Sequence, residues 1–160
     1  MSALSEITAE QIMSYKLLTV CETMSIQSLI DFFNKNGVSG APVLSKEGSI
    51  IGVVSLSDII NFDVNPKHSL TENPMTQYYL NSLEGISPDE LGLSEGNQHQ
   101  NHLVGEIMTR EVITTELSSS IPQIAGLMHE RGIHRVFVSH KGEICGVIST
   151  LDILKLVADN

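Results

Sequence analysis

The chain has 160 residues, of which 41% are hydrophobic and 18% are charged, so it can bury the core of one domain or of two small ones. Nineteen acidic residues against nine basic ones give a net charge of -10, which argues against binding to nucleic acids or anionic membranes through positive charge. No apolar run reaches the length of a transmembrane helix.

The N-terminus and the cysteines predict a cytoplasmic protein. The first residues lack the basic and apolar regions of a secretory signal. Cys21 and Cys145 have neither the spacing of metal ligands nor that of a disulfide framework, which suits a reducing compartment. The motifs of phosphate-binding loops, dinucleotide folds, zinc proteases and serine hydrolases are absent, so we expect no catalytic activity.

The chain contains two copies of one segment. Residues 9–62 realign with residues 104–157, and the matched runs include Ile12-Met13-Ser14 with Ile107-Met108-Thr109. Two copies are too few for a solenoid, which needs more units to bury its faces. The sequence therefore predicts two similar subdomains, at residues 8–62 and 104–158, joined by an insert at residues 63–103.

Each copy begins with a short strand and an amphipathic helix. The β-branched runs at 17–20 and 112–115 predict the strands. Apolar residues then recur at i, i+3, i+4 and i+7, which is the pattern of one buried helix face; they are Ile26, Leu29, Ile30 and Phe33 in the first copy, and Ile121, Ile124, Ala125 and Met128 in the second. Ser25 and Ser120 fit the N-cap position, and Gly37 and Gly132 fit a left-handed C-terminal position.

Two strands and a second helix complete each copy. We expect strands at 41–44 and 49–55 in the first copy, and at 136–139 and 143–149 in the second, with glycines at the tight turns. The second helices begin near Leu56 and Thr150. The order β-α-β-β-α therefore occurs twice, which predicts an α+β (α/β-like) fold.

The insert combines prolines with a polar tract. Short helices are expected at 77–83 and 88–93, and a loop at 95–102. His99 and His102 are three residues apart and could share a metal ion. Because no third ligand is evident, a solvated loop is the favoured interpretation.

The repeated motifs resemble the tandem CBS (cystathionine-β-synthase) domain pair, also called a Bateman module. Gly-Val-Ser-Gly-Ala-Pro-Val at 37–43 and Gly-Val-Val-Ser-Leu-Ser-Asp at 52–58 correspond to Gly-Ile-His-Arg-Val-Phe-Val at 132–138 and Gly-Val-Ile-Ser-Thr-Leu-Asp at 146–152. The His-Arg pair and the Ser-Leu-Ser-Asp run look most like the adenylate-sensing repeats in the γ subunit of AMP-activated protein kinase.

The resemblance implies a fold and a function. It implies two repeats packed sheet to sheet about a pseudo-twofold axis, with clefts that bind AMP, ADP, ATP or S-adenosylmethionine as a regulatory ligand rather than as a catalytic cofactor. It also implies a disc-like homodimer that regulates a separate protein. The alternative is a dimerisation or interaction scaffold that binds no ligand.

The resemblance also assigns ligand-binding residues. It implies that Asp58 and Asp152 hold the ribose diol, and that phosphate lies near the hydroxyls and the His-Arg pair, which are Ser55, Ser57, Ser149, Thr150, His134 and Arg135. The adenine slot would be walled by Thr19, Val20, Ala41, Pro42 and Thr114. An ionised carboxylate suits a diol because it only accepts hydrogen bonds, and the guanidinium of an arginine suits phosphate.

Structural alternatives stay open at each of these positions. Ser-x-x-Asp is also a helix capping pattern, Arg135 could instead pair with an acid such as Glu130, and β-branched wall residues would pack in a strand anyway. The first copy has Ser39-Gly40 where the second has His134-Arg135. We therefore expect the two sites to differ in their affinity for phosphate.

Overall fold

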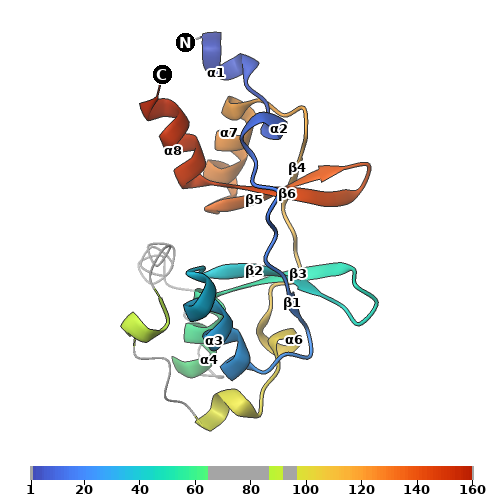
Figure 1. Ribbon diagram of the computed structural model, residues 1–160, viewed down its shortest axis with the longest axis vertical. Helices are drawn as coiled ribbons and strands as arrows, with labels where there is room; N and C mark the ends of the chain where they lie inside the picture. Colours follow the sequence, from blue (N-terminus) through green and yellow to red (C-terminus); the bar gives the residue numbers. More distant parts are fainter. Residues whose placement is uncertain (1, 65–86, 92–96, 160) are drawn as a thin grey trace. The chain divides into compact units, whose positions relative to one another are not determined.

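The protein forms two compact units, which a computed structural model describes over residues 2–64, 87–91 and 97–159 (Figure 1). One unit comprises residues 18–112 and is called the Asp58 unit here. The other comprises residues 1–17 and 113–160 and is called the Asp152 unit. Each unit has its own hydrophobic core.

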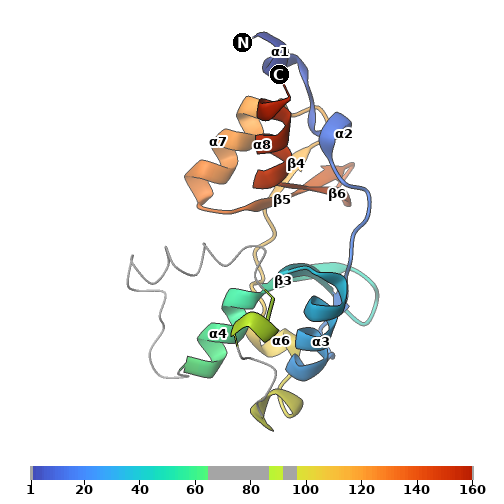
Figure 2. The same cartoon turned by 60° about the vertical axis from the view of Figure 1, so that its left-hand side comes forward.

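The Asp58 unit contains one mixed sheet and its covering helices. Its elements are β1 (Val20–Cys21), α3 (Ile26–Asn36), β2 (Gly40–Leu44), β3 (Ile50–Ser55), α4 (Leu56–Val64), η2 (Asp89–Leu91), η3 (Asn97–Gln100) and α6 (Val104–Ile107). The sheet order is β1-β2-β3, with β1 parallel and β3 antiparallel to β2. Helices α3 and α4 lie on one face of this sheet (Figures 1 and 2).

The Asp152 unit repeats the same topology. Its elements are α1 (Ser2–Glu6), α2 (Ala9–Ile12), β4 (Thr114–Glu116), α7 (Ile121–Arg131), β5 (Arg135–His140), β6 (Glu143–Ser149) and α8 (Thr150–Ala158). Strand β4 is parallel to β5, and β6 is antiparallel to it. The predicted α+β class and the β-α-β-β-α order are confirmed.

The predicted apolar stripes form the two cores. Ile26, Leu29, Ile30 and Phe33 of α3 are all 0% exposed. In α7, Ile121, Ile124 and Met128 are buried, while Ala125 is half-buried. Burial of such side chains stabilises each unit by roughly 1.5–3 kcal/mol per residue, so these stripes are what attach α3 and α7 to their sheets.

The predicted helix ends are confirmed. Ser25 accepts a hydrogen bond from the Ser28 amide at 3.1 Å, so it caps α3. Gly37 and Gly132 end α3 and α7 with φ of 62° and 60°. Glycine adopts this left-handed conformation without the steric cost that a Cβ atom adds, which explains its position in both copies.

The first strand of each copy starts later than predicted. Residues 17–19 and 112–113 are not in strands, because β1 begins only at Val20 and β4 only at Thr114. Val20 pairs with Val43, and Thr114 pairs with Phe137. β-branched composition alone does not reveal where the partner strand ends, so the sequence placed these strands too early.

The opening residues of each copy pack with the other copy. The Ala9 amide donates to Ser119 O at 2.8 Å, and Ser14 forms a two-way backbone bridge with Val147. Similarly, the Val104 amide donates to Met24 O at 2.8 Å. The ranges 8–62 and 104–158 therefore describe copies in the sequence, whereas the compact units exchange their first segments.

Two matched glycines allow this exchange. A Cβ atom on Gly52 would lie 2.6 Å from Thr109 O, and one on Gly146 would lie 2.5 Å from Met13 Sδ. Real Cβ atoms do not come so close to other heavy atoms, so a larger residue at Gly52 would push the crossing backbone away, and one at Gly146 would displace the Met13 side chain. Met13 and Met108 are buried beside these glycines, as expected of residues that fill gaps in a core.

Part of the insert packs against the Asp58 unit. The predicted helix at 77–83 lies outside the described residues, and within 88–93 the structure has the short 3-10 helix η2. The solvated loop predicted at His99 is wrong, because His99 lies in η3 and is 3% exposed. Its Nε2 donates to Asp63 Oδ1 at 2.7 Å, and this bond satisfies one of the two buried ring nitrogens.

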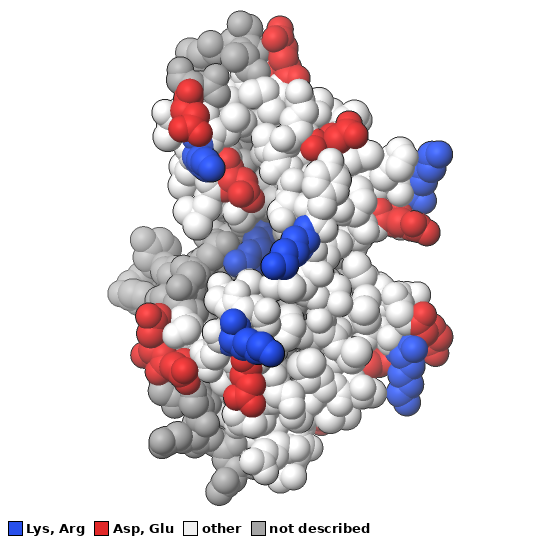
Figure 3. Space-filling model, in the orientation of Figure 1, with Lys and Arg blue, Asp and Glu red and all other residues white. Residues whose placement is uncertain are grey.

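Within the part of the chain that the structure describes, every helix is too short or too polar to cross the hydrocarbon layer of a membrane. On the face drawn in Figure 3, acidic and basic side chains are mixed over both units.

Candidate ligand-binding site

The carboxylate of Asp58 lies at the start of α4, where β3 passes directly into the helix. Its Oδ2 accepts hydrogen bonds from the Ser55 amide at 2.8 Å and the Ser55 hydroxyl at 3.2 Å. The Ser55 hydroxyl also contacts the Ser57 hydroxyl at 2.6 Å. Across the unit, the Thr109 hydroxyl donates to Asp58 Oδ1 at 3.5 Å. The predicted residues Ser55, Ser57 and Asp58 are thus brought together.

Burial raises the pKa of the Asp58 carboxyl from 3.8 to about 6. Hydrogen bonds from Ser55 and Thr109 favour the ionised form and limit this rise in pKa. A half-buried carboxylate with a raised pKa is common at functional sites, although helix capping alone also produces such bonds.

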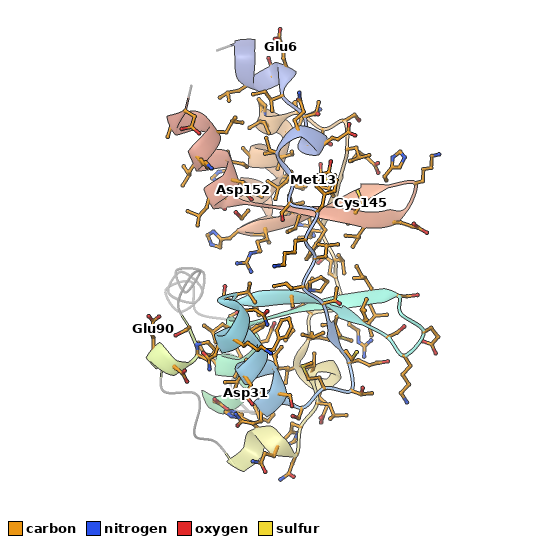
Figure 4. All side chains as sticks on the ribbon, viewed as in Figure 1. Glu6, Met13, Asp31, Glu90, Cys145 and Asp152 are labelled. Carbon is orange, nitrogen blue, oxygen red and sulfur yellow. The ribbon has the colours of Figure 1, made fainter. Side chains whose placement is uncertain are left out.

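Asp152 occupies the matching position at the start of α8, as Figure 4 shows. Its Oδ2 accepts from the Ser149 amide at 2.7 Å and from the Ser149 hydroxyl at 2.8 Å. Ser149 in turn accepts from the Asp152 amide at 3.3 Å, which completes a capping box. Oδ1 of Asp152 accepts no hydrogen bond from the described residues.

The His-Arg pair lies beside the α8 start. Thr150 donates to the His134 carbonyl oxygen through its amide at 2.9 Å and through its hydroxyl at 3.2 Å. Arg135 is directly opposite Ser149 in the β5–β6 register, so their side chains share one face of the sheet. Five of the predicted residues, including Asp152, therefore gather in the Asp152 unit.

In the Asp58 unit, Ser39 and Gly40 occupy the positions of His134 and Arg135. The Leu56 amide donates to Ser39 O at 2.9 Å, and Gly40 is opposite Ser55 in the β2–β3 register. The correspondence expected from the repeat is therefore present in space. At its own helix start, the Asp58 unit has no imidazole or guanidinium at these two positions.

The residues predicted to wall an adenine slot lie in or beside the strands. Val20 is 1% exposed and Ala41 is 5% exposed, and both belong to the Asp58 core. Pro42 is buried in β2, and Thr19 is half-buried just before β1. Thr114 is exposed in β4 of the other unit. Strand packing explains the side chains of Val20 and Ala41 without any ligand.

Thr109 contacts a candidate site residue, Asp58, and the sequence did not identify it. Its match to Ser14 was visible in the aligned Ile-Met-Thr and Ile-Met-Ser runs, yet nothing in the spacing indicated a contact with Asp58. The two are 51 residues apart, so only tertiary structure brings them together. No group of three or more metal-ligating side chains is found among the described residues.

Relatives of the chain include an uncharacterized protein from Methanocaldococcus jannaschii. It is 28% identical over 144 residues, which are 88% of this chain and 85% of that protein. Two other relatives from that organism are longer, and the matches span 42% and 31% of their lengths.

Solved structures with the same fold include two that contain ligands. One is CBSX2 in complex with AMP, with a TM-score of 0.67, 20% identity, and coverage of 95% of this chain and 97% of that chain. Another is the CBS domain pair of protein MJ0100 in complex with 5′-methylthioadenosine and S-adenosyl-L-methionine, with a TM-score of 0.64, 18% identity, and coverage of 96% and 97%.

A family model shows which segments carry the likeness. The CBS domain model matches residues 9–65 and 104–159, which together exceed half of the chain and coincide with the two copies. The chain therefore belongs to the CBS domain family and contains a tandem pair of these domains.

Proposed function

We propose that the protein is a non-catalytic sensor that binds an adenosine-containing ligand, such as AMP, ADP, ATP or S-adenosylmethionine, and regulates a separate partner protein. The observation that carries this proposal is the carboxylate held at each strand-to-helix junction, at Asp58 and Asp152. A ribose diol presents two hydroxyl donors, and an ionised carboxylate is the side chain that accepts both. Ligands in the related structures support this chemistry.

Each carboxylate is supported from one side and can accept hydrogen bonds from the other. In both copies a serine fixes Oδ2 through its amide and its hydroxyl, so the side chain is oriented before any ligand arrives. Such preorganisation lowers the entropic cost of binding. Helix capping and diol binding are therefore compatible, since they use different oxygen atoms of the same carboxylate.

Phosphate recognition in this proposal depends on His134 and Arg135. An arginine presents several donors in one plane, and the N-terminal end of α8 carries partial positive charge. The base bound in the Asp58 unit would contact Thr19, Val20, Ala41 and Pro42, and the base bound in the Asp152 unit would contact Thr114. Because Val20 and Ala41 are buried in the core, their backbone groups rather than their side chains would read the edge of the base in the Asp58 unit.

Calorimetric titration of AMP, ADP, ATP and S-adenosylmethionine tests the proposal. We expect at least one ligand to bind below the millimolar range, and Asp152→Asn to weaken it by roughly 10- to 100-fold, because a hydrogen bond to a charged group is worth about 1.5–3 kcal/mol. Asparagine keeps an acceptor for Ser149, so the cap survives. Asp31→Asn, on the exposed side of α3 (Figure 4), removes the same charge elsewhere and should bind normally.

The proposal fails if none of the four ligands binds, or if Asp58→Asn and Asp152→Asn both bind as tightly as the unmodified protein. Enzymatic use of the site is tested separately by measuring phosphate release from ATP with and without magnesium. We expect none, because the sequence lacks the phosphate-binding loop motif of nucleotide hydrolases.

A second candidate function is a dimerisation scaffold. Helix α8 is apolar, yet it has no fully buried residue, and Leu151, Leu154 and Val157 are 65%, 56% and 51% exposed. These three side chains recur every three residues and form one exposed strip. We propose that this strip is a homodimer contact, which is compatible with ligand binding.

Sedimentation of Leu154→Glu tests the dimer. We expect the variant to be monomeric and its unfolding free energy per chain at high dilution to change little, since Leu154 is already exposed. The matched control is Tyr15→Glu, because it also replaces an exposed apolar side chain by a charge. Leu127→Glu is not suitable, because Leu127 packs against the core. If every ligand leaves the melting temperature unchanged while this dimer forms, the scaffold function replaces the sensor function.

A further inference from the structure

We propose that Thr109 sets the ligand specificity of the Asp58 site, because its hydroxyl occupies one of the acceptor positions that a ribose diol needs. As a consequence, Asp58 distinguishes ribose from 2′-deoxyribose less well than Asp152 does. This inference rests on the proposed function, since it concerns how the two carboxylates receive the same sugar.

The two carboxylates differ in how many acceptor positions remain free for a ligand. A carboxylate has about four lone-pair positions, two on each oxygen. In both copies Oδ2 already accepts two hydrogen bonds, from the amide and the hydroxyl of one serine. Oδ1 of Asp58 also accepts from Thr109 at 3.5 Å, whereas Oδ1 of Asp152 has no donor among the described residues. One position remains at Asp58 and two at Asp152.

The Thr109 hydroxyl is held in place by its backbone. Thr109 and Val53 exchange two backbone hydrogen bonds of 2.8 Å each. The carbonyl oxygen of Thr109 also lies so close to Gly52 that a Cβ atom there would come within 2.6 Å of it. The segment cannot swing away from β3 without losing these contacts. Rotation about χ1 is the remaining way to free Oδ1, and β-branching restricts it.

The second copy makes the same backbone contacts without the same side-chain contact. Ser14, the match of Thr109, bridges to Val147 with hydrogen bonds of 2.9 and 3.0 Å. Ser14 is exposed, and no side-chain hydrogen bond joins it to Asp152 within the described ranges. Because the backbones agree, the difference between the two sites comes from the side chain at this position.

The sugar chemistry follows from this count. AMP brings two hydroxyl donors, and 2′-deoxy-AMP brings one. Asp152 can accept both donors on Oδ1, so loss of the 2′-hydroxyl removes a hydrogen bond there. Asp58 accepts one donor and must displace Thr109 to accept a second, so the 2′-hydroxyl contributes little to binding at Asp58.

The test compares AMP with 2′-deoxy-AMP by calorimetry, with one carboxylate removed at a time. Asp152→Asn isolates the Asp58 site, and Asp58→Asn isolates the Asp152 site. At each site we take the ratio of the dissociation constant of 2′-deoxy-AMP to that of AMP. We expect this ratio to be roughly five-fold larger at the Asp152 site than at the Asp58 site, since a net hydrogen bond is worth about 1 kcal/mol. Adding Thr109→Val to Asp152→Asn should raise the Asp58 ratio by roughly the same factor.

Two further variants test whether the side chain at position 109 sets the ratio. Thr109→Ser places the residue of the second copy at this position and should raise the ratio at Asp58 toward that at Asp152, because Ser14 makes no side-chain hydrogen bond to Asp152 within the described ranges. Thr109→Val combined with Asp58→Asn should leave the ratio at Asp152 unchanged. An equal ratio with threonine and valine overturns the assignment of Thr109. Absence of AMP binding in both Asp152→Asn and Asp152→Asn/Thr109→Val also overturns it, whereas binding that appears only with valine supports it.

A measurement without ligand keeps this inference distinct from the proposed function. Because the Thr109 hydrogen bond lowers the pKa of Asp58, Thr109→Val should raise that pKa above about 6 in a carbon-detected NMR titration. An unchanged pKa means that the contact is not made, and the inference falls. If AMP binding depends on neither carboxylate, the proposed function fails together with the inference drawn from it, even where the NMR contact is observed.

Discussion

In the Asp58 unit, the carboxylate at the helix start bonds to a serine of its own turn and to a threonine 51 residues away, whereas in the Asp152 unit it bonds to one local serine. The two bonds from the serine amide and hydroxyl to Oδ2 are the same in both copies because the Ser-x-x-Asp spacing encodes them. The tertiary bond differs because it depends on the segment exchanged between the copies. The duplicated sequence thus preserves a helix start and leaves its surroundings free to diverge.

The residues at the strand starts strengthen this contrast. His134 and Arg135 flank the helix start of the Asp152 unit, and Ser39 and Gly40 flank that of the Asp58 unit. The two helix starts therefore differ in the charge that each one's own unit places beside it. The following predictions are ordered from the largest expected effect to the smallest.

The glycine that contacts the exchanged segment should tolerate substitution less well in the Asp58 unit than in the Asp152 unit. Alanine at Gly52 would meet the Thr109 backbone oxygen at 2.6 Å, whereas alanine at Gly146 would first meet the end of the Met13 side chain, which can turn aside. We expect Gly52→Ala to destabilise the protein by about 3 kcal/mol and Gly146→Ala by about 1 kcal/mol, measured by urea unfolding. Equal losses would show that the backbone contact is no tighter than the side-chain contact.

Protonation of Asp58 should stabilise the Asp58 unit, so this group should contribute more to the free energy of unfolding at acid pH than at neutral pH. Burial raises its pKa from 3.8 to about 6, so the folded protein binds more protons than the unfolded chain between these values. Stability from this group is therefore complete below about pH 4 and is lost as pH rises through about 6.

Asparagine at position 58 removes this titration. The unfolding free energy of Asp58→Asn relative to the unmodified protein should rise by up to about 3 kcal/mol between pH 4 and pH 7. The two proteins share all other titrating groups, so the difference isolates Asp58. A difference that does not change with pH would show that burial does not perturb this carboxyl.

The packed part of the insert should stabilise only the Asp58 unit. His99 is 3% exposed and its ring bonds to Asp63 on α4, so His99→Ala removes both packing and a hydrogen bond. We expect a loss of about 2 kcal/mol in unfolding free energy. His102, whose side chain is 42% exposed, is the matched control, and His102→Ala should cost less than about 1 kcal/mol. Similar losses at both positions would contradict the role of burial.

The accuracy of the sequence-based predictions follows the range of the interactions involved. The α3 stripe and the cap at Ser25 depend on neighbours within eight residues, and both were predictable. The contact of Thr109 with Asp58, the burial of His99 and the exchange of first segments depend on residues far apart in the chain. Periodicity and capping patterns carry no information about such pairs, so only the folded structure reveals them.

The helix caps provide the finest comparison between the units. Ser25 accepts a hydrogen bond from the Ser28 amide, whereas the Ser120 hydroxyl donates to Gln123 Oε1 at 3.1 Å, and Gln123 separately accepts from the Ser120 amide at 2.9 Å. Ser25→Ala leaves a helix amide without its partner and should cost about 1 kcal/mol. Ser120→Ala retains the bond from its own amide to Gln123 and should cost about 0.5 kcal/mol, so urea unfolding should separate the two variants. If Ser120→Ala proved the more damaging, its hydroxyl would have to cap α7 directly, and the two helix starts would be stabilised in the same way.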